Sequence, residues 1–140
     1  VDLRTCLANS FCLSADVCAA FDPGFSEVFE RKNAAYLNYG VGLCKYTGSG
    51  GKSGASDASS EVVGTSRKLL NDHKIAWQMC ELGKTDAGGG GTVAKYMAKR
   101  NIDTLDAGVP VLSMHAPFEV VAKYDCYMTY RAVKAIFEEN

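Results

Sequence analysis

Hydrophobic and polar residues alternate along this chain in short segments that predict strands. An apolar segment of small residues at 10–20 is followed by a Pro-Gly turn signal, and it predicts a strand that finishes near Asp16. β-Branched, aromatic and other apolar residues predict buried strands at 41–47 and 75–82, and one or two more at 102–115. The residues between 26 and 40 are expected to form a loop with at most one helical turn.

Apolar residues at helical spacing predict three helices between and after these strands. The first runs from 57 or 59 to about Lys74, the second covers 92–100, and the third covers 120–139. In the third, the face toward the core is expected to contain Tyr124, Met128, Ala132 and Ile136.

Alternating strands and helices are typical of an α/β fold, here a layered α/β/α sheet with helices on both faces. Right-handed crossovers would place the carboxyl ends of the strands, and any site, at one edge of the sheet. The first strand is expected to be central, with no helix ahead of it.

A Gly/Ser-rich segment at 48–60 is too short to link domains and predicts a mobile loop at the edge of a site. Its Lys52 does not belong to a P-loop, because the position that requires glycine in that motif is occupied by Tyr46. A loop that presents Lys52 to a substrate carboxylate is favoured instead.

A second glycine-rich segment, at 83–92, leads toward the helix predicted at 92–100. The backbone N–H groups of Gly90, Gly91 and Thr92 are suited to bind an anion or a carbonyl oxygen, because glycine lets a ligand come close. A tight strand-to-helix turn with no ligand explains the same residues equally well, and the pattern does not decide between them.

Length and charge limit the classes of protein. A chain of 140 residues with 47% hydrophobic and 22% charged residues is expected to form one globular domain. A net charge of -1, with acidic and basic residues interspersed, argues against a nucleic-acid partner. No apolar run approaches the ~18 residues that cross a bilayer, so no membrane partner is expected.

Six cysteines occur without a CxxC pair, at positions 6, 12, 18, 44, 80 and 126. Most have apolar neighbours and are interpreted as small buried side chains in a reducing compartment. A structural zinc site and a disulfide-bridged secreted fold are the alternatives.

Asp16 and His115 are the residues whose positions suggest chemistry. Asp16 follows a strand expected to be buried, where an ionised carboxylate is costly unless it is paired or coordinated. His115 also follows a strand, although a single histidine there is more often a hydrogen-bonded residue than a ligand. Together they would converge on one sheet edge, and carboxylate and imidazole suit a zinc-type hydrolytic centre. The other histidine, His73, is explained by a helix carboxyl end.

Several ordered motifs give the chain a resemblance to a known family. The segments "SADV", "KSGASDA", "ELGKTDAGGGGTVAKYMA", "DTLDAGVPVLSMHAPFE" and "VAKYDCYMTYRAVKAIFEE" resemble the C-terminal part of the aspartyl-aminopeptidase family of zinc aminopeptidases, particularly its bacterial members. The resemblance implies that residues 1–140 are the C-terminal portion of a larger metallo-aminopeptidase catalytic domain. The parent would be a cytoplasmic homo-oligomer that removes N-terminal residues from peptides with two zinc ions, other divalent metals being possible.

The resemblance also implies roles for individual residues. Asp16 and His115 match metal ligands, and Glu119 matches a glutamate expected to support the histidine. Residues matching the substrate-binding positions are Lys52, Gly90, Gly91 and Thr92. The remaining metal ligands and the general-base glutamate of the family lie upstream of the matched stretch, so no catalytic residue is assigned here and the isolated chain is expected to be inactive. The alternatives are a small non-enzymatic α/β module that binds an anion or a peptide terminus, and a fragment with no function of its own.

Overall fold

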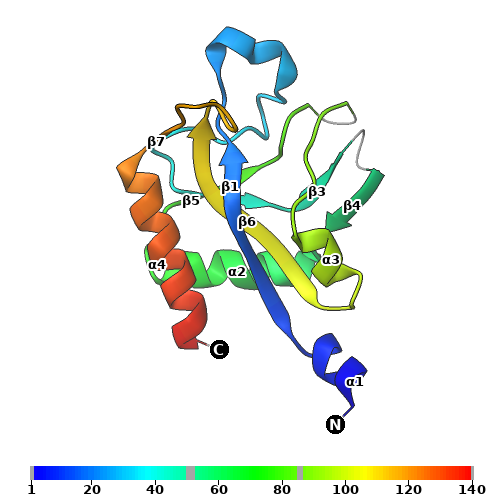
Figure 1. Cartoon of the computed structure of the whole chain (residues 1–140). Helices are drawn as coiled ribbons and strands as arrows, with labels where there is room; N and C mark the ends of the chain where they lie inside the picture. Colours follow the sequence, from blue (N-terminus) through cyan, green and yellow to red (C-terminus); the bar gives the residue numbers. More distant parts are fainter. Residues whose placement is uncertain (1, 50–52, 85–86, 140) are drawn as a thin grey trace.

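The computed structural model describes residues 2–49, 53–84 and 87–139, and its strands form a mixed five-stranded sheet flanked by helices and a separate two-stranded sheet (Figure 1). The strand order is β1 (Phe11–Ala19), β6 (Asp103–Leu112), β2 (Val41–Cys44) and β5 (Trp77–Cys80), with β7 (Val120–Val121) paired to the end of β6. The predicted α/β class with helices around a sheet is confirmed, whereas β1 is an edge strand among the described strands and not a central one.

The strands do not all run in one direction. β1 and β6 are parallel, β2 is antiparallel to β6, and β5 is parallel to β2. The prediction that strand carboxyl ends share one edge is therefore correct for β1 and β6 and wrong for β2 and β5. The register places Cys44 beside Asp106 and Asp106 beside Ser14, so β2 and β5 end near the middle of β1.

The described residues contain five helical segments. They are α1 (Leu3–Ala8), the 3₁₀ helix η1 (Pro23–Val28), α2 (Ser60–Asp72), α3 (Ala94–Ala98) and α4 (Lys123–Glu139). The Ser59 side chain caps α2 by accepting a hydrogen bond from the Val62 amide at 3.3 Å. In the described part of the chain, none of these helices has the length and apolar character needed to cross a bilayer.

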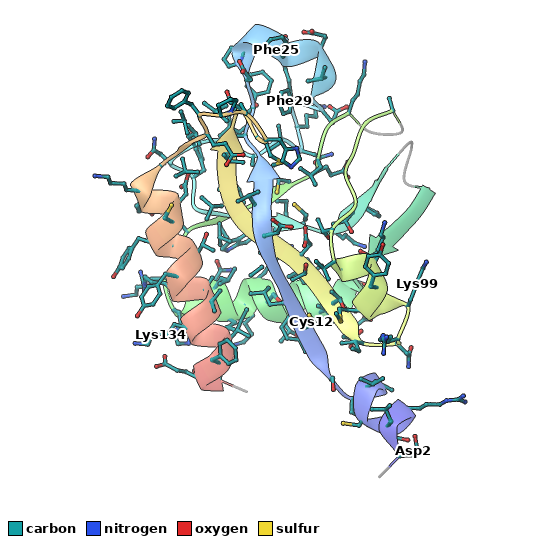
Figure 2. The ribbon with its side chains drawn as sticks, in the orientation of Figure 1. Asp2, Cys12, Phe25, Phe29, Lys99 and Lys134 are labelled. Carbon is teal, nitrogen blue, oxygen red and sulfur yellow. The ribbon has the colours of Figure 1, made fainter. Side chains whose placement is uncertain are left out.

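Two helix predictions were wrong. Helix α1 was not expected, and it begins because the Asp2 side chain accepts a hydrogen bond from the Thr5 amide at 3.0 Å. It projects from the end of the molecule opposite η1, which contains Phe25 and is followed by Phe29 (Figure 2). Helix α4 starts three residues later than expected, because Val120 and Val121 pair with the end of β6 as β7.

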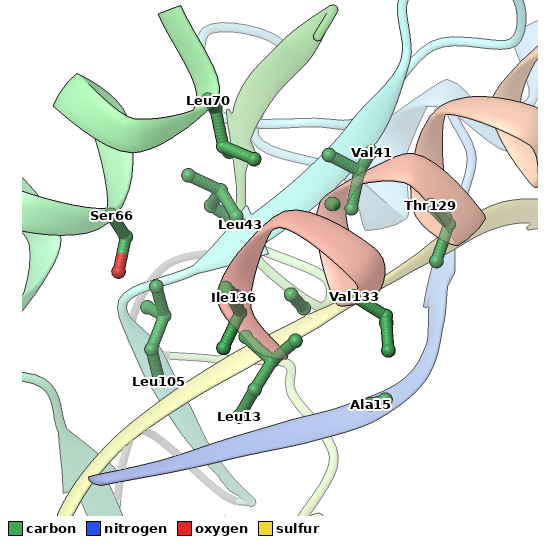
Figure 3. A pocket seen from close by; sticks show the side chains of 12 residues that line it. Leu13, Ala15, Val41, Leu43, Ser66, Leu70, Leu105, Thr129, Val133 and Ile136 are labelled. Atoms are coloured by element: carbon green, nitrogen blue, oxygen red, sulfur yellow. The ribbon is translucent and has the colours of Figure 1, made fainter. Parts of the chain in front are cut away.

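Helices α2 and α4 pack on one face of the sheet and form the main hydrophobic core with it. Figure 3 shows Leu13, Leu43 and Leu105 of the sheet facing these helices, around a residual cavity of only about 10 Å³. The buried face of α4 is centred on Met128 and Ala132, as predicted, but its remaining buried members are Asp125 and Ala135. Tyr124, expected on that face, is exposed.

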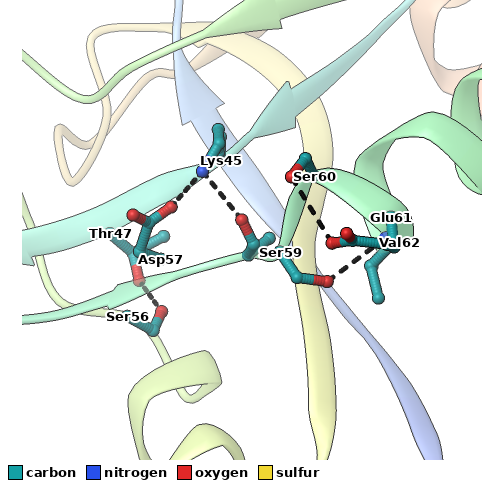
Figure 4. A network of polar contacts seen from close by, with 9 residues as sticks. Lys45, Thr47, Ser56, Asp57, Ser59, Ser60, Glu61 and Val62 are labelled. Carbon is teal, nitrogen blue, oxygen red and sulfur yellow. Dashed lines mark hydrogen bonds and ion pairs between the residues drawn. The ribbon is translucent and has the colours of Figure 1, made fainter.

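A β-hairpin replaces the mobile loop predicted at 48–60. β3 (Tyr46–Ser49) and β4 (Ser53–Asp57) are antiparallel, and the single strand predicted at 41–47 is divided between β2 and β3. The buried Thr47 and Ser56 hydroxyls lie 2.6 Å apart, and Lys45 joins the base of the hairpin through an ion pair with Asp57 (Figure 4). These polar side chains stabilise strands that a hydrophobic pattern does not reveal.

The second face of the sheet is covered by α3 and by the segments around it. Helix α3 packs against β6, β1 and the hairpin. Cys18, Cys44 and Cys80 are buried on this face as a second, smaller cluster that also includes Ala35. All six cysteines are free thiols. The prediction that the cysteines are buried is correct for Cys18, Cys44 and Cys80 and wrong for Cys6 and Cys126, which are exposed.

Candidate functional site

The parallel pair β1 and β6 determines the position of Asp16. The register places Asp16 beside Gly108, and a Cβ atom on Gly108 would lie 2.1 Å from the Asp16 carbonyl oxygen. Glycine at 108 therefore lets the two strands approach at the residue that carries the candidate ligand. Asp16 lies inside β1, three residues before its end, and its side chain is exposed. The desolvation argument made for a buried Asp16 thus does not apply.

His115 lies in a tight turn after β6. Ser113 and His115 both have left-handed backbones, with φ values of 57° and 68°, and the Ala116 amide donates to the Ser113 carbonyl at 2.9 Å. Left-handed conformations are uncommon for residues other than glycine. The His115 amide donates a 2.6 Å hydrogen bond to Glu119 Oε1, which holds the turn in this conformation.

Asp16 and His115 line the same pocket, which has a volume of about 340 Å³. Three apolar side chains and the glycine-rich segment form the rest of its wall. The other lining residues are Val17, Leu82, Gly83, Gly89, Gly90, Gly91, Thr92 and Met114. The structure thus brings the two candidate ligands together with three of the four candidate substrate-binding residues. The fourth, Lys52, lies outside the described residues.

The glycine-rich segment forms a compact turn at the pocket wall. Gly83 and Gly89 have φ values of 80° and 121°, and the Gly88 amide donates to the Lys84 carbonyl at 2.7 Å. The helix predicted from 92 begins at Ala94, whose amide donates to Thr92 Oγ1 at 3.3 Å. Since α3 has only five residues, the segment contributes to the pocket mainly by close backbone approach.

Asp106 is a residue of this region that the sequence interpretation missed. It lies on β6, is 3% exposed, and its Oδ1 has no hydrogen-bond partner among the described residues. Burial raises the pKa of Asp106 to about 6, although the Ser14 and Thr92 hydroxyls act in the opposite direction. An acidic residue inside an otherwise apolar strand segment, "DTLDAGVPVL", was the available signal.

The donor atoms fit one side of a metal site. Asp16 and His115 supply a carboxylate and an imidazole, and both side chains are exposed in the pocket. Within residues 2–49, 53–84 and 87–139, no group of three or more histidine, cysteine or acidic side chains is arranged to hold a metal ion. Protein zinc sites use three or four protein ligands, so these two residues would have to act together with ligands outside the described residues.

Comparison with known proteins identifies the family. The model of the aminopeptidase I zinc metalloprotease family (M18) matches residues 2–137. The chain belongs to this family. The resemblance to the C-terminal part of bacterial zinc aminopeptidases is thereby confirmed.

The relatives are much longer than this chain. A probable M18 family aminopeptidase 1 from Borreliella burgdorferi (strain ZS7) is 52% identical over 137 residues, which are 98% of this chain and 30% of that protein. The crystal structure of an M18 family aminopeptidase from Thermotoga maritima is 46% identical, with a TM-score of 0.90 over 96% of this chain and 30% of that one. A Saccharomyces cerevisiae structure described as the mApe1 dodecamer is 26% identical, with a TM-score of 0.74 over 99% of this chain and 29% of that one. The chain therefore spans about 30% of the first two relatives.

Proposed function

We propose that this chain is the C-terminal portion of the catalytic domain of a metal-dependent aminopeptidase that removes N-terminal residues from peptides. The observation that carries the proposal is the pocket shared by Asp16 and His115, two side chains with the donor chemistry of zinc ligands in a chain of a zinc metalloprotease family.

In this proposal Asp16 and His115 each hold a divalent metal ion, zinc by family description, and two ions are present in the full-length protein. When bound, such ions supply Lewis-acid polarisation of the scissile carbonyl and a nucleophile derived from bound water. Glu119 holds the main chain of His115 and so positions its imidazole. The exposed carboxylate of Asp16 on β1 and the constrained turn of His115 after β6 support a fixed separation of the two ligands.

The glycine-rich wall of the pocket would hold the substrate. Gly90 and Gly91 carry no side chains that block approach, so their backbone groups and that of Thr92 are placed to hydrogen-bond a peptide main chain. Lys52 would meet a substrate carboxylate as a point charge.

The remaining ligands and the general base would come from the part of the full-length protein that precedes this chain. Two protein ligands fall short of the number that binds zinc tightly, so the isolated chain is proposed to be inactive. The dodecamer described for the yeast relative supports a homo-oligomer for the full-length protein. A cytoplasmic location is part of the same proposal, and the free cysteines support it.

A histidine substitution tests the proposal, because the chain contains only two histidines. In the full-length protein, His115→Ala is expected to lower aminopeptidase activity and bound metal. The loss should exceed the roughly 10–100-fold that follows removal of a residue that only hydrogen-bonds a metal ligand. The matched control is His73→Ala, since His73 lies at the end of α2 and pairs with Glu139. Activity on aminoacyl chromogenic substrates and metal content by mass spectrometry are the two measurements. Unchanged metal content and activity in His115→Ala would refute the assignment.

A further inference from the structure

Three buried thiols meet on the second face of the sheet, where β2 and β5 end. Cys44 and Cys80 are the last residues of these parallel strands and are register partners. Their Sγ atoms lie 3.1 Å apart. A Cβ atom on Gly42 would lie 2.5 Å from the Cys18 sulfur and 2.8 Å from the Cys80 sulfur, so the absence of a side chain at 42 leaves the space that these sulfurs occupy.

The backbone geometry around Cys44 and Cys80 suits a covalent bond. Neighbouring strands lie about 4.7–4.9 Å apart, within the roughly 4.4–6.8 Å between Cα atoms that a disulfide spans. Bonding requires the two sulfurs to approach by about 1 Å, to the ~2.05 Å of an S–S bond. Closing the pair therefore requires a movement of only about 1 Å. We propose that Cys44 and Cys80 are a disulfide-forming pair, closed by a peroxide-class oxidant and opened by thiol reductants.

The oxidation balances with one hydrogen peroxide for each pair of thiols. The first sulfur attacks a peroxide oxygen and breaks the O–O bond. It becomes a sulfenic acid, and the released hydroxide takes the thiol proton to give water. The second sulfur then attacks the sulfenic sulfur, and the leaving hydroxide takes the second thiol proton to form another water. Two thiols are oxidised and the peroxide is reduced to two waters.

The disulfide would connect the residues that precede the β3–β4 hairpin and the glycine-rich segment. Lys45 and the β3–β4 hairpin follow Cys44, whereas Leu82 and Gly83, which line the pocket of Asp16, follow Cys80 almost directly. Closing the pair would therefore fasten the base of the hairpin to the base of the glycine-rich segment. This inference concerns thiol chemistry and does not depend on the proposed aminopeptidase function.

The environment of the pair determines how it reacts. Hydrogen bonding with Cys18 and then with Cys44, together with burial, raises the pKa of the Cys80 thiol. Cys44 and Cys80 are each only 2% exposed. Oxidation is therefore slow, needs local opening of the fold, and is faster at mildly alkaline pH, because the thiolate is the reacting form.

Peptide mapping tests the proposal on the purified full-length protein that contains this chain. The exposed Cys6 and Cys126 are first replaced by serine to prevent bonds between molecules. The protein is oxidised with hydrogen peroxide at mildly alkaline pH over hours, then unfolded, alkylated and digested with trypsin. Cys44 and Cys80 are released in separate peptides, 33–45 and 75–84, whereas Cys12 and Cys18 share a third.

The expected product is a cross-link between peptides 33–45 and 75–84 that has lost two hydrogen atoms and disappears on reduction, with Cys12 and Cys18 alkylated. Alkylation of both Cys44 and Cys80 after oxidation would overturn the proposal, and so would a cross-link that contains Cys18. Cys18→Ala in the same background is expected to retain the cross-link. Loss of the cross-link in that variant, with its circular dichroism spectrum unchanged, would contradict the assigned pair.

Discussion

Glu119 accepts a hydrogen bond of 2.6 Å from the main-chain amide of His115, four residues earlier in the chain. The bond closes a turn in which His115 has a φ of 68°. Such a backbone is unfavourable for a side chain with a Cβ atom, so Glu119 supplies part of the free energy that keeps His115 in the pocket. Glu119 is a positioning residue in this account, acting through the main chain of a proposed ligand.

Replacing Glu119 separates this positioning role from other roles. Glu119→Ala removes the acceptor and is expected to lower metal affinity and activity of the full-length protein by about 10–100-fold. Glu119→Gln keeps a carbonyl oxygen that accepts the same hydrogen bond, so it is expected to retain most of both. Metal titration and steady-state kinetics of the two variants are the measurements. Equal losses in Glu119→Gln and Glu119→Ala would show that the negative charge matters and the hydrogen bond does not.

Asp125 is expected to be important for stability. It is fully buried on α4, and its two carboxylate oxygens accept hydrogen bonds from the amides of Asn38 and Gly40 at 2.8 and 2.7 Å. Asp125→Asn replaces one acceptor with an amino group, which leaves a buried donor without a partner, at a cost of about 1–3 kcal/mol in the free energy of unfolding.

Denaturant unfolding of the chain measures that cost, and Asp72→Asn is the matched control. Asp72 forms an exposed ion pair with Lys68 on α2, and its loss is expected to change stability by at most about 1 kcal/mol. Equal effects of the two substitutions would contradict the structural role of Asp125.

Asp106 is expected to make stability depend on pH. Its pKa is about 6 in the folded chain and 3.8 without the fold, because burial disfavours the charged carboxylate. Between pH 3.8 and about 6 the folded state binds more protons than the unfolded state, so the free energy of unfolding falls as pH rises through this range. The stabilising contribution of Asp106 is complete below about pH 4, and it is lost above about pH 6. Asp106→Asn should remove this change.

The measurement compares metal-free wild type with Asp106→Asn by denaturant unfolding at several pH values between 4 and 7.5. The wild type is expected to lose stability relative to the variant as pH rises through this window. A constant difference between the two proteins would show that Asp106 titrates alike in both states.

Two glycines give a steric test of the contact between β1 and β6. Gly108→Ala would place a methyl group 2.1 Å from the Asp16 carbonyl oxygen, so the strands must separate. The expected loss is at least about 1–3 kcal/mol of unfolding free energy, together with weaker metal binding in the full-length protein. Gly64→Ala, on α2, adds a methyl group with no atom within 4 Å beyond its chain neighbours and the backbone of its own helix, and it is expected to stabilise by about 0.5–1 kcal/mol. A similar gain in Gly108→Ala would contradict the close approach of the strands at Asp16.

The sequence predicted the elements that bury apolar side chains at regular spacing. The β1 and β6 segments and α2 were recognisable because their own residues carry the pattern and, for α2, the Ser59 cap. The direction of the strands could not be predicted, since side chains alternate with the same period in parallel and antiparallel strands. Helix α1 was missed because a polar cap stabilises it, and the β3–β4 hairpin was missed because paired hydroxyls stabilise it. Neither element depends on an apolar face that a sequence pattern would reveal.

The candidate site could be predicted in part, because some of its residues lie in or after strands that the apolar pattern predicted. Asp16 and His115 belong to two predicted strand segments that run parallel, so the expected topology indicated their convergence. It did not account for the glycine-rich segment, because β5, which precedes that segment, runs in the opposite direction. Asp125 could not be recognised, because its partners Asn38 and Gly40 lie 87 and 85 residues away in the sequence. The contacts of Asp106 with Ser14 and Thr92, which act against the effect of burial on its pKa, likewise form only in the folded chain.

The most direct test of the account is anomalous X-ray diffraction from zinc-loaded crystals of the full-length protein that contains this chain. The account predicts metal peaks in the pocket, with an oxygen of Asp16 and a ring nitrogen of His115 each about 2.0–2.2 Å from a zinc ion. Metal peaks that lie elsewhere, or an imidazole of His115 turned away from the metal, would contradict it.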